Sequence, residues 1–173
     1  MKRLVCLLVF LVAASALAQS KPPAELKQLD PFVGKWSCKG TVYAGEWGPE
    51  HPTVFNIDTH WSLGGQWLYT DYAETKTAKN PHPMKGIGLW SYDTDAKKFV
   101  GGWVDNNGMY QTQESDGWKG DEIVFTGPTH NGGMTGMTGR DTFKGKGKTI
   151  THLFEIEMKG TWKKYESDSC TKM

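Results

Sequence analysis

The feature that most constrains this chain is a succession of short β-type runs separated by tight-turn residues, which begins near residue 32 and continues almost to the end of the sequence. The runs are rich in Val, Ile, Thr, Trp and Tyr, and Gly, Asn and Asp gather between them at hairpin spacing. These turn residues supply the positive φ or the side-chain capping that hairpins need. No later segment shows sustained helical periodicity. The pattern predicts an all-β domain.

We expect about ten strands joined by consecutive hairpins. Turn sequences such as Asn106-Asn107-Gly108 and Lys159-Gly160 lie between them. A closed sheet has no exposed edges, and one continuous meander suits closure, so we favour a single antiparallel closed β-barrel over a sandwich. The expected strands cover residues 35–43, 53–63, 66–74, 84–92, 98–105, 109–114, 121–126, 135–143, 148–158 and 161–167.

The start of the chain has a different composition from this domain. Lys2 and Arg3 precede an apolar run that is too short to remain in a membrane, and small residues follow up to Ala18. These features predict a signal peptide cleaved near Ala18 and an exported protein, periplasmic or secreted, without stable membrane insertion. The expected division is a signal peptide at 1–18, a lead-in with a short helical turn at 19–31, the barrel at 32–168 and a C-terminal tail at 169–173.

Charge excludes one class of partner. Without Lys2 and Arg3 the chain carries 18 basic and 19 acidic residues, a net charge of about −1. The chain is nearly neutral and has no cluster of basic residues, so we expect no binding to nucleic acid. The sequence identifies no protein partner.

Two cysteines follow the expected cleavage point. Cys38 lies near the start of the first expected strand and Cys170 near the end of the last. In a closed barrel with an even number of up-and-down strands these positions are adjacent, and an exported protein meets oxidising conditions. We therefore predict a Cys38–Cys170 disulfide, with two free thiols as the alternative.

Alternation along two strands indicates which side chains face the interior. In the run from Thr149, His152 falls on the same face as four apolar residues, and in the run from Phe99, Trp103 faces inward with Asp105 nearer the rim. The chain has 8 tryptophans, many for a domain of this size, and core filling is the favoured interpretation for any single one, although as a group they also suit the walls of a pocket. Trp90 is expected on the strand next to Trp103, but the sequence leaves open whether its side chain points inward or outward. The expected ligand-binding residues are Trp90, Trp103, Asp105, His152, Phe154, Ile156 and Met158.

Motifs for catalysis or for metal binding are not visible. The chain contains no Gly-x-Ser-x-Gly, His-Glu-x-x-His or Cys-x-x-Cys sequence. Asp58 and His60 share one face of a strand, but without a third ligand we expect a solvated face rather than a metal site. We expect no catalytic residue, and the motifs favour a non-enzymatic protein.

Several short motifs occur in a fixed order along the chain. They are Phe32-Val33-Gly34-Lys35-Trp36, Gly64-Gly65-Gln66-Trp67-Leu68, and Tyr92-Asp93 followed by Phe99-Val100-Gly101-Gly102-Trp103-Val104-Asp105. Through them the chain resembles a bacterial lipocalin-like family of unknown function over roughly residues 25 to 167. The resemblance implies a calycin-type antiparallel barrel, often exported, and brings no agreed catalytic residue.

A more distant resemblance is to the nitrobindin barrels, which are ten-stranded haem proteins. Gly34, Trp36 and Gly40 match their opening motif, whereas Cys38 stands where those proteins tend to have glycine. The resemblance implies haem as a cofactor, with His152 as a loose match to the haem ligand.

Three functions remain open at this point. The first is an exported barrel that binds a small apolar ligand in its interior, with no cofactor. The second is a haem-binding barrel that uses His152. The third is a structural or interaction module of the cell envelope whose barrel is a filled core.

Overall fold

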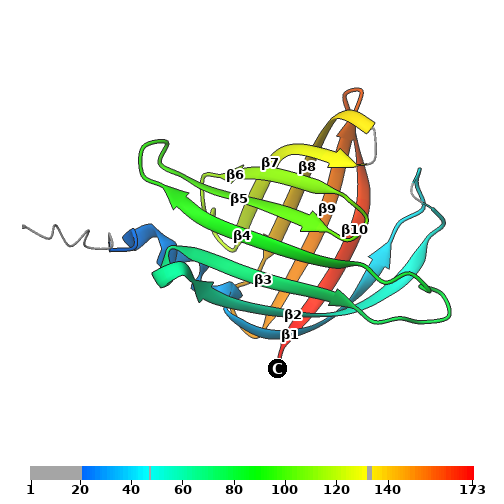
Figure 1. Cartoon of the computed structure of the whole chain (residues 1–173), viewed down its shortest axis with the longest axis horizontal. Coiled ribbons are helices and arrows are strands. Elements are labelled where there is room, and N and C mark those ends of the chain that lie inside the picture. The colour runs from blue at the N-terminus through cyan, green and yellow to red at the C-terminus, as the bar shows by residue number, and fades with distance from the viewer. Residues whose placement is uncertain (1–20, 47, 132–133) are drawn as a thin grey trace, which may run out of the picture.

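Ten antiparallel strands form a closed barrel, which confirms the predicted fold class (Figure 1). The computed structural model describes residues 21–46, 48–131 and 134–173, so the expected signal peptide at 1–18 lies outside the described residues. Two 3-10 helical segments accompany the strands. The elements are η1 (Ala24–Phe32), β1 (Gly34–Val42), β2 (His51–Ser62), η2 (Leu63–Gly65), β3 (Trp67–Glu74), β4 (Lys85–Asp93), β5 (Lys98–Asp105), β6 (Tyr110–Ser115), β7 (Glu122–Asn131), β8 (Met134–Lys144), β9 (Thr149–Met158) and β10 (Thr161–Lys172).

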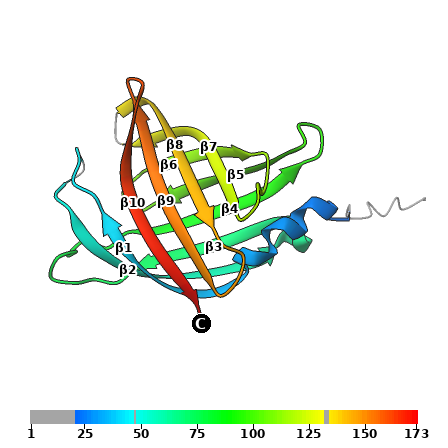
Figure 2. The ribbon, with the colours of Figure 1, turned by 180° about the vertical axis from the view of Figure 1, so that it is seen from behind.

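Each strand pairs with its neighbours in the sequence, and β1 pairs with β10 to close the barrel. Figure 2 shows β1, β10 and β9 side by side along this closing wall. Within the closing pair, Cys38 lies directly opposite Cys170, and their sulfur atoms form the predicted disulfide. The last strand of the sheet is therefore bonded covalently to the first.

The expected C-terminal tail at 169–173 is wrong for all but its last residue. β10 continues to Lys172, and Lys172 is paired with Trp36 of β1. The backbone of these residues finds its hydrogen-bond partners in β1, which the closure of the barrel brings alongside. The expected strand at 121–126 is likewise longer, because β7 extends to Asn131.

Inward-facing glycines in β4 and β5 leave room for two large rings. Gly86 lies under the ring of Trp103, and Gly88 and Gly101 lie under the ring of Trp90, so closely that a Cβ atom at any of these positions would overlap the indole. Both tryptophans can therefore lie flat inside the barrel wall. The side chain of Trp90, whose direction the sequence leaves ambiguous, points into the barrel.

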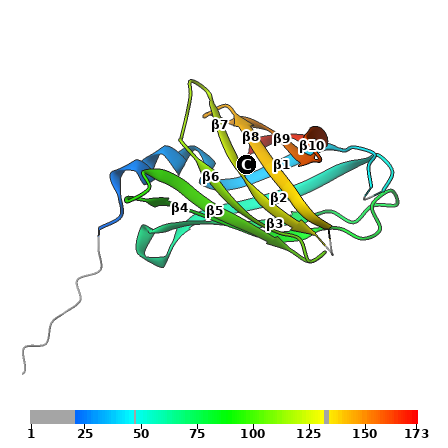
Figure 3. The same ribbon diagram turned by 90° about the horizontal axis from the view of Figure 1, so that it is seen from above.

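The N-terminal segment η1 covers one end of the barrel, where Figure 3 shows it in blue. Leu26 and Leu29 are buried and pack against the interior residues Leu68, Phe99 and Phe125. Three indole N–H groups of the barrel also donate hydrogen bonds to this segment. The pairs are Trp36 to the Phe32 carbonyl at 2.8 Å, Trp61 to Asp30 at 3.0 Å and Trp118 to the Gln28 carbonyl at 2.7 Å.

We predict that reduction of the disulfide destabilises the barrel by about 4 kcal/mol, because Cys38 and Cys170 close a long loop and so restrict the unfolded chain. They are 132 residues apart in the sequence. Urea unfolding of the oxidised protein and of the Cys38→Ala/Cys170→Ala variant measures the difference. Equal urea midpoints would show that strand pairing alone holds the barrel closed.

Candidate functional site

The barrel encloses a cavity of about 150 Å³. All ten strands and η1 contribute side chains to its wall. A cavity of this size in a protein core can hold a benzene-sized molecule. The wall is largely aromatic, and its rings are Phe32, Trp36, Phe55, Tyr72, Trp90, Trp103, Phe125, Phe143, Phe154 and Tyr165, together with the imidazole of His152.

Four of the seven expected ligand-binding residues line this cavity. They are Trp90, Trp103, His152 and Phe154. Ile156 is buried and Met158 partly buried in a cluster that includes the cavity-lining residues Met109 and Phe154, but neither Ile156 nor Met158 lines the cavity itself.

Asp105 does not reach the cavity, and its carboxylate has a structural role. Its Oδ1 atom accepts hydrogen bonds from the backbone N–H groups of Asn107 and Met109, at 2.8 and 3.1 Å. Its Oδ2 atom accepts the indole N–H of Trp103 at 3.3 Å. Asp105 therefore holds the β5–β6 turn and fixes the orientation of Trp103, which does line the cavity.

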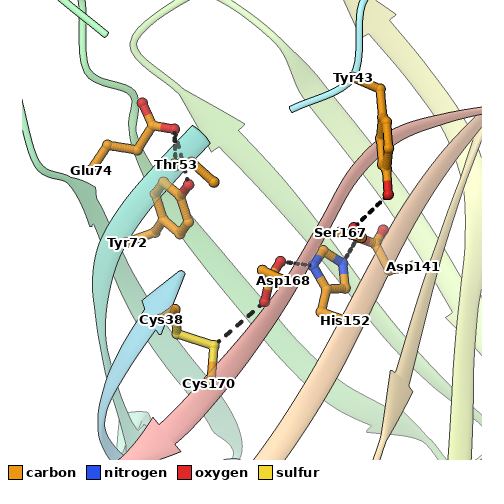
Figure 4. A network of polar contacts seen from close by, with 10 residues as sticks. All are labelled: Cys38, Tyr43, Thr53, Tyr72, Glu74, Asp141, His152, Ser167, Asp168 and Cys170. Atoms are coloured by element: carbon orange, nitrogen blue, oxygen red, sulfur yellow. Dashed lines mark hydrogen bonds and ion pairs between the residues drawn. A yellow bond between two sulfur atoms is a disulfide. The ribbon is translucent and has the colours of Figure 1, made fainter. Parts of the chain in front are cut away.

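His152 is held between two carboxylates, as Figure 4 shows. Its Nδ1 atom lies 2.8 Å from Asp168 Oδ2 and its Nε2 atom 2.8 Å from Asp141 Oδ1. Phe143 stacks on the imidazole at 4.5 Å between ring centroids. Burial alone would lower the pKa of His152, but the charges and hydrogen bonds of Asp168 and Asp141 outweigh it and raise the pKa well above its ordinary value. Both ring nitrogens face carboxylate oxygens, and this geometry fits an imidazolium that donates one ring proton to each carboxylate.

The two carboxylates are themselves fixed in place. Asp141 also accepts hydrogen bonds from the side-chain amides of Gln111 and Gln113 of β6. Asp168 packs over Gly40 of β1, where a Cβ atom would overlap it. The other oxygen of Asp168 lies 3.5 Å from the disulfide sulfur of Cys170, a contact without a hydrogen bond because this sulfur carries no proton.

Glu74 of β3, a partly buried acid, has a hydrogen-bond partner for each carboxylate oxygen. Its carboxylate accepts hydrogen bonds from the hydroxyls of Thr53 and Tyr72, at 2.9 and 3.3 Å (Figure 4). It also accepts the Asn80 amide at 2.8 Å and the Met84 backbone N–H at 2.5 Å. Glu74 therefore ties the β3–β4 connection to the barrel.

Glu166 of β10 differs from these acids. The residue is only 5% exposed, it lines the cavity, and its Oε1 atom has no hydrogen-bond partner among the described residues. Burial, together with the negative charges of Asp168, Glu74 and Asp141, raises the pKa of Glu166 to about 8, while His152 opposes the shift. At neutral pH the carboxyl group is mostly protonated.

A second polar atom on the cavity wall has no partner. The indole Nε1 of Trp90 is buried and makes no hydrogen bond among the described residues, although Trp90 lines the cavity. An indole nitrogen can only donate. Buried polar atoms are nearly always paired in folded proteins, so two unpaired atoms on side chains that line one cavity depart from the usual pattern.

Sequence reasoning missed Asp141, Glu166 and Asp168, although one signal was present for two of them. Cys170 must lie on the same face of the sheet as Cys38 to bond with it, and a period of two from Cys170 places Asp168 and Glu166 on that face as well. The bulge between Lys164 and Glu166 breaks this alternation earlier in the strand. No comparable signal identifies Asp141.

His152 does not fit the role of haem ligand that the distant resemblance implies. An iron ligand needs a ring nitrogen with a free lone pair, and both nitrogens of His152 are hydrogen-bonded to carboxylates. Haem is also a large ligand for a cavity of about 150 Å³, since sites for drug-sized molecules begin at about 300 Å³. Among the residues that the structure describes, no group of three or more His, Cys, Asp or Glu side chains is arranged to hold a metal ion.

Comparison with known proteins identifies the family. Residues 21–167 match the family described as "Protein of unknown function (DUF1579)", and the chain belongs to this family. The crystal structure of Rv2717c from M. tuberculosis is similar in fold, with a TM-score of 0.71 and 10% sequence identity over 88% of this chain and 99% of that one. No curated protein matches.

Within the described segments, no helix has the length and apolar character to cross a bilayer.

We predict that the Glu166→Gln substitution stabilises the protein and that the gain grows with pH. The pKa of Glu166 is raised to about 8, so the folded state keeps a proton that the unfolded state releases above about pH 4.5. Stability of the wild type therefore falls between these values, by at most about 1.4 kcal/mol per pH unit for this group. Urea unfolding at about pH 4, 6 and 8 measures the trend.

The matched control for this experiment is Glu114→Gln. Glu114 pairs with Lys98 on the outer face of the barrel, and its side chain is 59% exposed. This variant should follow the pH dependence of the wild type. A pH dependence that is the same in all three proteins would contradict the buried, protonated state of Glu166.

We also predict that His152 carries two ring protons at about pH 7.5, because its carboxylate partners raise its pKa well above the ordinary value. Nitrogen-15 NMR of the imidazole distinguishes the charged ring from the neutral one. Asp168→Asn should lower the pKa of His152 by at least one unit, about 1.4 kcal/mol of lost interaction. A neutral ring in the wild type at this pH would overturn the assignment.

Proposed function

We propose that this barrel binds a small, largely apolar molecule with a polar end in its interior cavity. The observation that carries the proposal is the pair of buried unpaired atoms, Glu166 Oε1 and Trp90 Nε1, on the wall of one cavity. A buried polar atom without a partner costs about 1–3 kcal/mol. A ligand that supplies a partner to either atom gains affinity from a group that the protein leaves unpaired.

The cavity wall supports an apolar body for this ligand. Trp90, Trp103 and Phe154 present ring surface to the cavity, and the glycines beneath the two indoles allow their rings to lie in the wall instead of filling the space. Aromatic walls with a few placed polar groups are typical of small-molecule sites. This use of a barrel interior is the lipocalin-like one that the sequence motifs imply.

The same observations favour ligand binding over a purely structural module. A filled core pairs nearly all of its polar groups, as the barrel does at the partly buried Glu74 with four donors. Glu166 departs from this pattern at the cavity wall. The haem alternative is not favoured, because both nitrogens of His152 are already engaged.

We further propose that the protein acts outside the cytoplasm. The Cys38–Cys170 disulfide supports this proposal, since structural disulfides persist in oxidising compartments. The basic start and apolar run within residues 1–18 point the same way. The N-terminal sequence of the protein recovered from its native envelope fraction tests it: a start near Gln19 is expected, and a start at Met1 would contradict it.

Benzyl alcohol, a neutral benzene-sized probe with one hydroxyl, tests cavity binding. We expect an affinity in about the millimolar range or tighter. In proton–nitrogen NMR spectra of the oxidised protein, the indole N–H signals of Trp90 and Trp103 should shift on titration. The signal of Trp162, which is 37% exposed and stacks with Arg140 outside the cavity, should stay in place.

Trp90→Phe and Trp162→Phe form the matched pair of variants. Trp90→Phe keeps an aromatic ring but removes the unpaired donor, so binding should weaken about 3- to 10-fold. Trp162→Phe should bind as the wild type does. Indole shifts that spread over surface positions, or no shift at saturating probe, would show that the interior is closed to ligands.

A further inference from the structure

The chemistry around Glu166 gives more detail about the polar end of the ligand. Ionisable groups from four strands act on this carboxyl group: Glu74 from β3, Asp141 from β8, His152 from β9 and Asp168 from β10. Two tyrosines, Tyr72 and Tyr165, also line the same cavity. Burial and the nearby acids raise their pKa values, so both stay neutral. The interior therefore holds four acids and one base.

His152, the base of this group, already has both ring nitrogens hydrogen-bonded to the acids. His152 donates one ring proton to Asp141 and the other to Asp168. It therefore has no donor left for a ligand. Since acids outnumber the imidazolium, an anionic ligand such as a carboxylate would be repelled, a neutral ligand would be accepted, and a cation would meet uncompensated negative charge.

The walls next to Glu166 are also suited to a cation. Phe154 is the cross-strand partner of Glu166, and Tyr165 packs edge-on against Phe154 at 5.5 Å between ring centroids. Tyr72 and Trp103 form a second edge-on pair, also at 5.5 Å. All four rings line the cavity. Aromatic faces attract ammonium groups, most strongly where water is excluded.

We propose that the ligand of this cavity is a small organic ammonium ion, which places its charged nitrogen against the open oxygen of Glu166 and its hydrocarbon body against the aromatic wall. This inference rests on the proposed function, because it specifies the ligand of the same cavity. The nitrogen donates to Glu166 Oε1, the atom that the fold leaves without a partner. The ion pair replaces a neutral buried carboxyl group.

Binding involves the release of one proton. The free protein holds Glu166 mostly protonated at neutral pH, since its pKa is raised to about 8. The ammonium ion keeps its own proton, and the carboxyl group gives its proton to solvent as the ion pair forms. Affinity should therefore rise about tenfold per pH unit from about pH 6 towards pH 8 and then level off. A neutral ligand shows no such rise.

Three probes of matched size test the proposal: benzylammonium, benzyl alcohol and benzoate. Calorimetric titration of the oxidised protein at about pH 7 should give an affinity at least tenfold higher for benzylammonium than for benzyl alcohol, and no binding of benzoate. Titration of benzylammonium in buffers of different ionisation enthalpy should reveal release of about 0.9 proton per ligand.

Two variants test whether the preference for benzylammonium depends on the carboxyl group of Glu166. Glu166→Gln should lose the preference for benzylammonium, at least tenfold in affinity, and keep benzyl alcohol binding. Glu114→Gln, which alters an exposed carboxylate on the outer face, should keep the preference. Proton release and the pH dependence are measured on the wild type, so the test remains decisive if Glu166→Gln fails to fold.

The outcomes separate the two proposals. Equal binding of benzylammonium and benzyl alcohol, a preference for benzoate, or a preference that survives in Glu166→Gln would overturn the ammonium proposal and leave the cavity as a ligand site. If none of the three probes binds, both the proposed function and this inference fail.

Discussion

The closure of ten strands into one barrel is the constraint on which the rest of the structure depends. Eight strands already leave an interior that side chains fill or that holds one small ligand, and ten strands make it wider. Here closure is fixed by the pairing of β1 with β10 and by the Cys38–Cys170 disulfide, while η1 covers one end. Even with a largely aromatic interior, a cavity of about 150 Å³ remains.

Most buried polar groups of the described residues are hydrogen-bonded, and two of the three side-chain atoms that are not belong to residues that line the cavity. Glu74 has four donors, and both ring nitrogens of His152 are hydrogen-bonded within the row Asp141–His152–Asp168. Glu166 Oε1 and Trp90 Nε1 are left open on the cavity wall. This difference separates the groups that hold the barrel together from the groups that the proposed ligand would pair.

Much of the fold could be predicted from the sequence, because alternation and turn residues are local signals. These signals predict the ten strands and the inward direction of the His152 side chain. The disulfide follows because a closed barrel brings the first strand beside the last. The carboxylate partners of His152 could not be predicted, since a charged residue in a strand normally marks the solvent face and only the barrel brings Asp141 and Asp168 to either side of the ring. The inward direction of the Trp90 side chain depends on Gly88 of its own strand and on Gly101 of the neighbouring strand, which leave room for the ring.

A crystal structure of the oxidised protein soaked with benzylammonium tests the central claim most directly. The claim is that the interior is a ligand site whose open polar atom is Glu166 Oε1. We expect the benzyl ring between the aromatic side chains of the cavity wall, with the ammonium nitrogen within hydrogen-bond distance of Glu166. An interior in which Trp90 and Trp103 fill the space and Glu166 is paired with another protein group would contradict it.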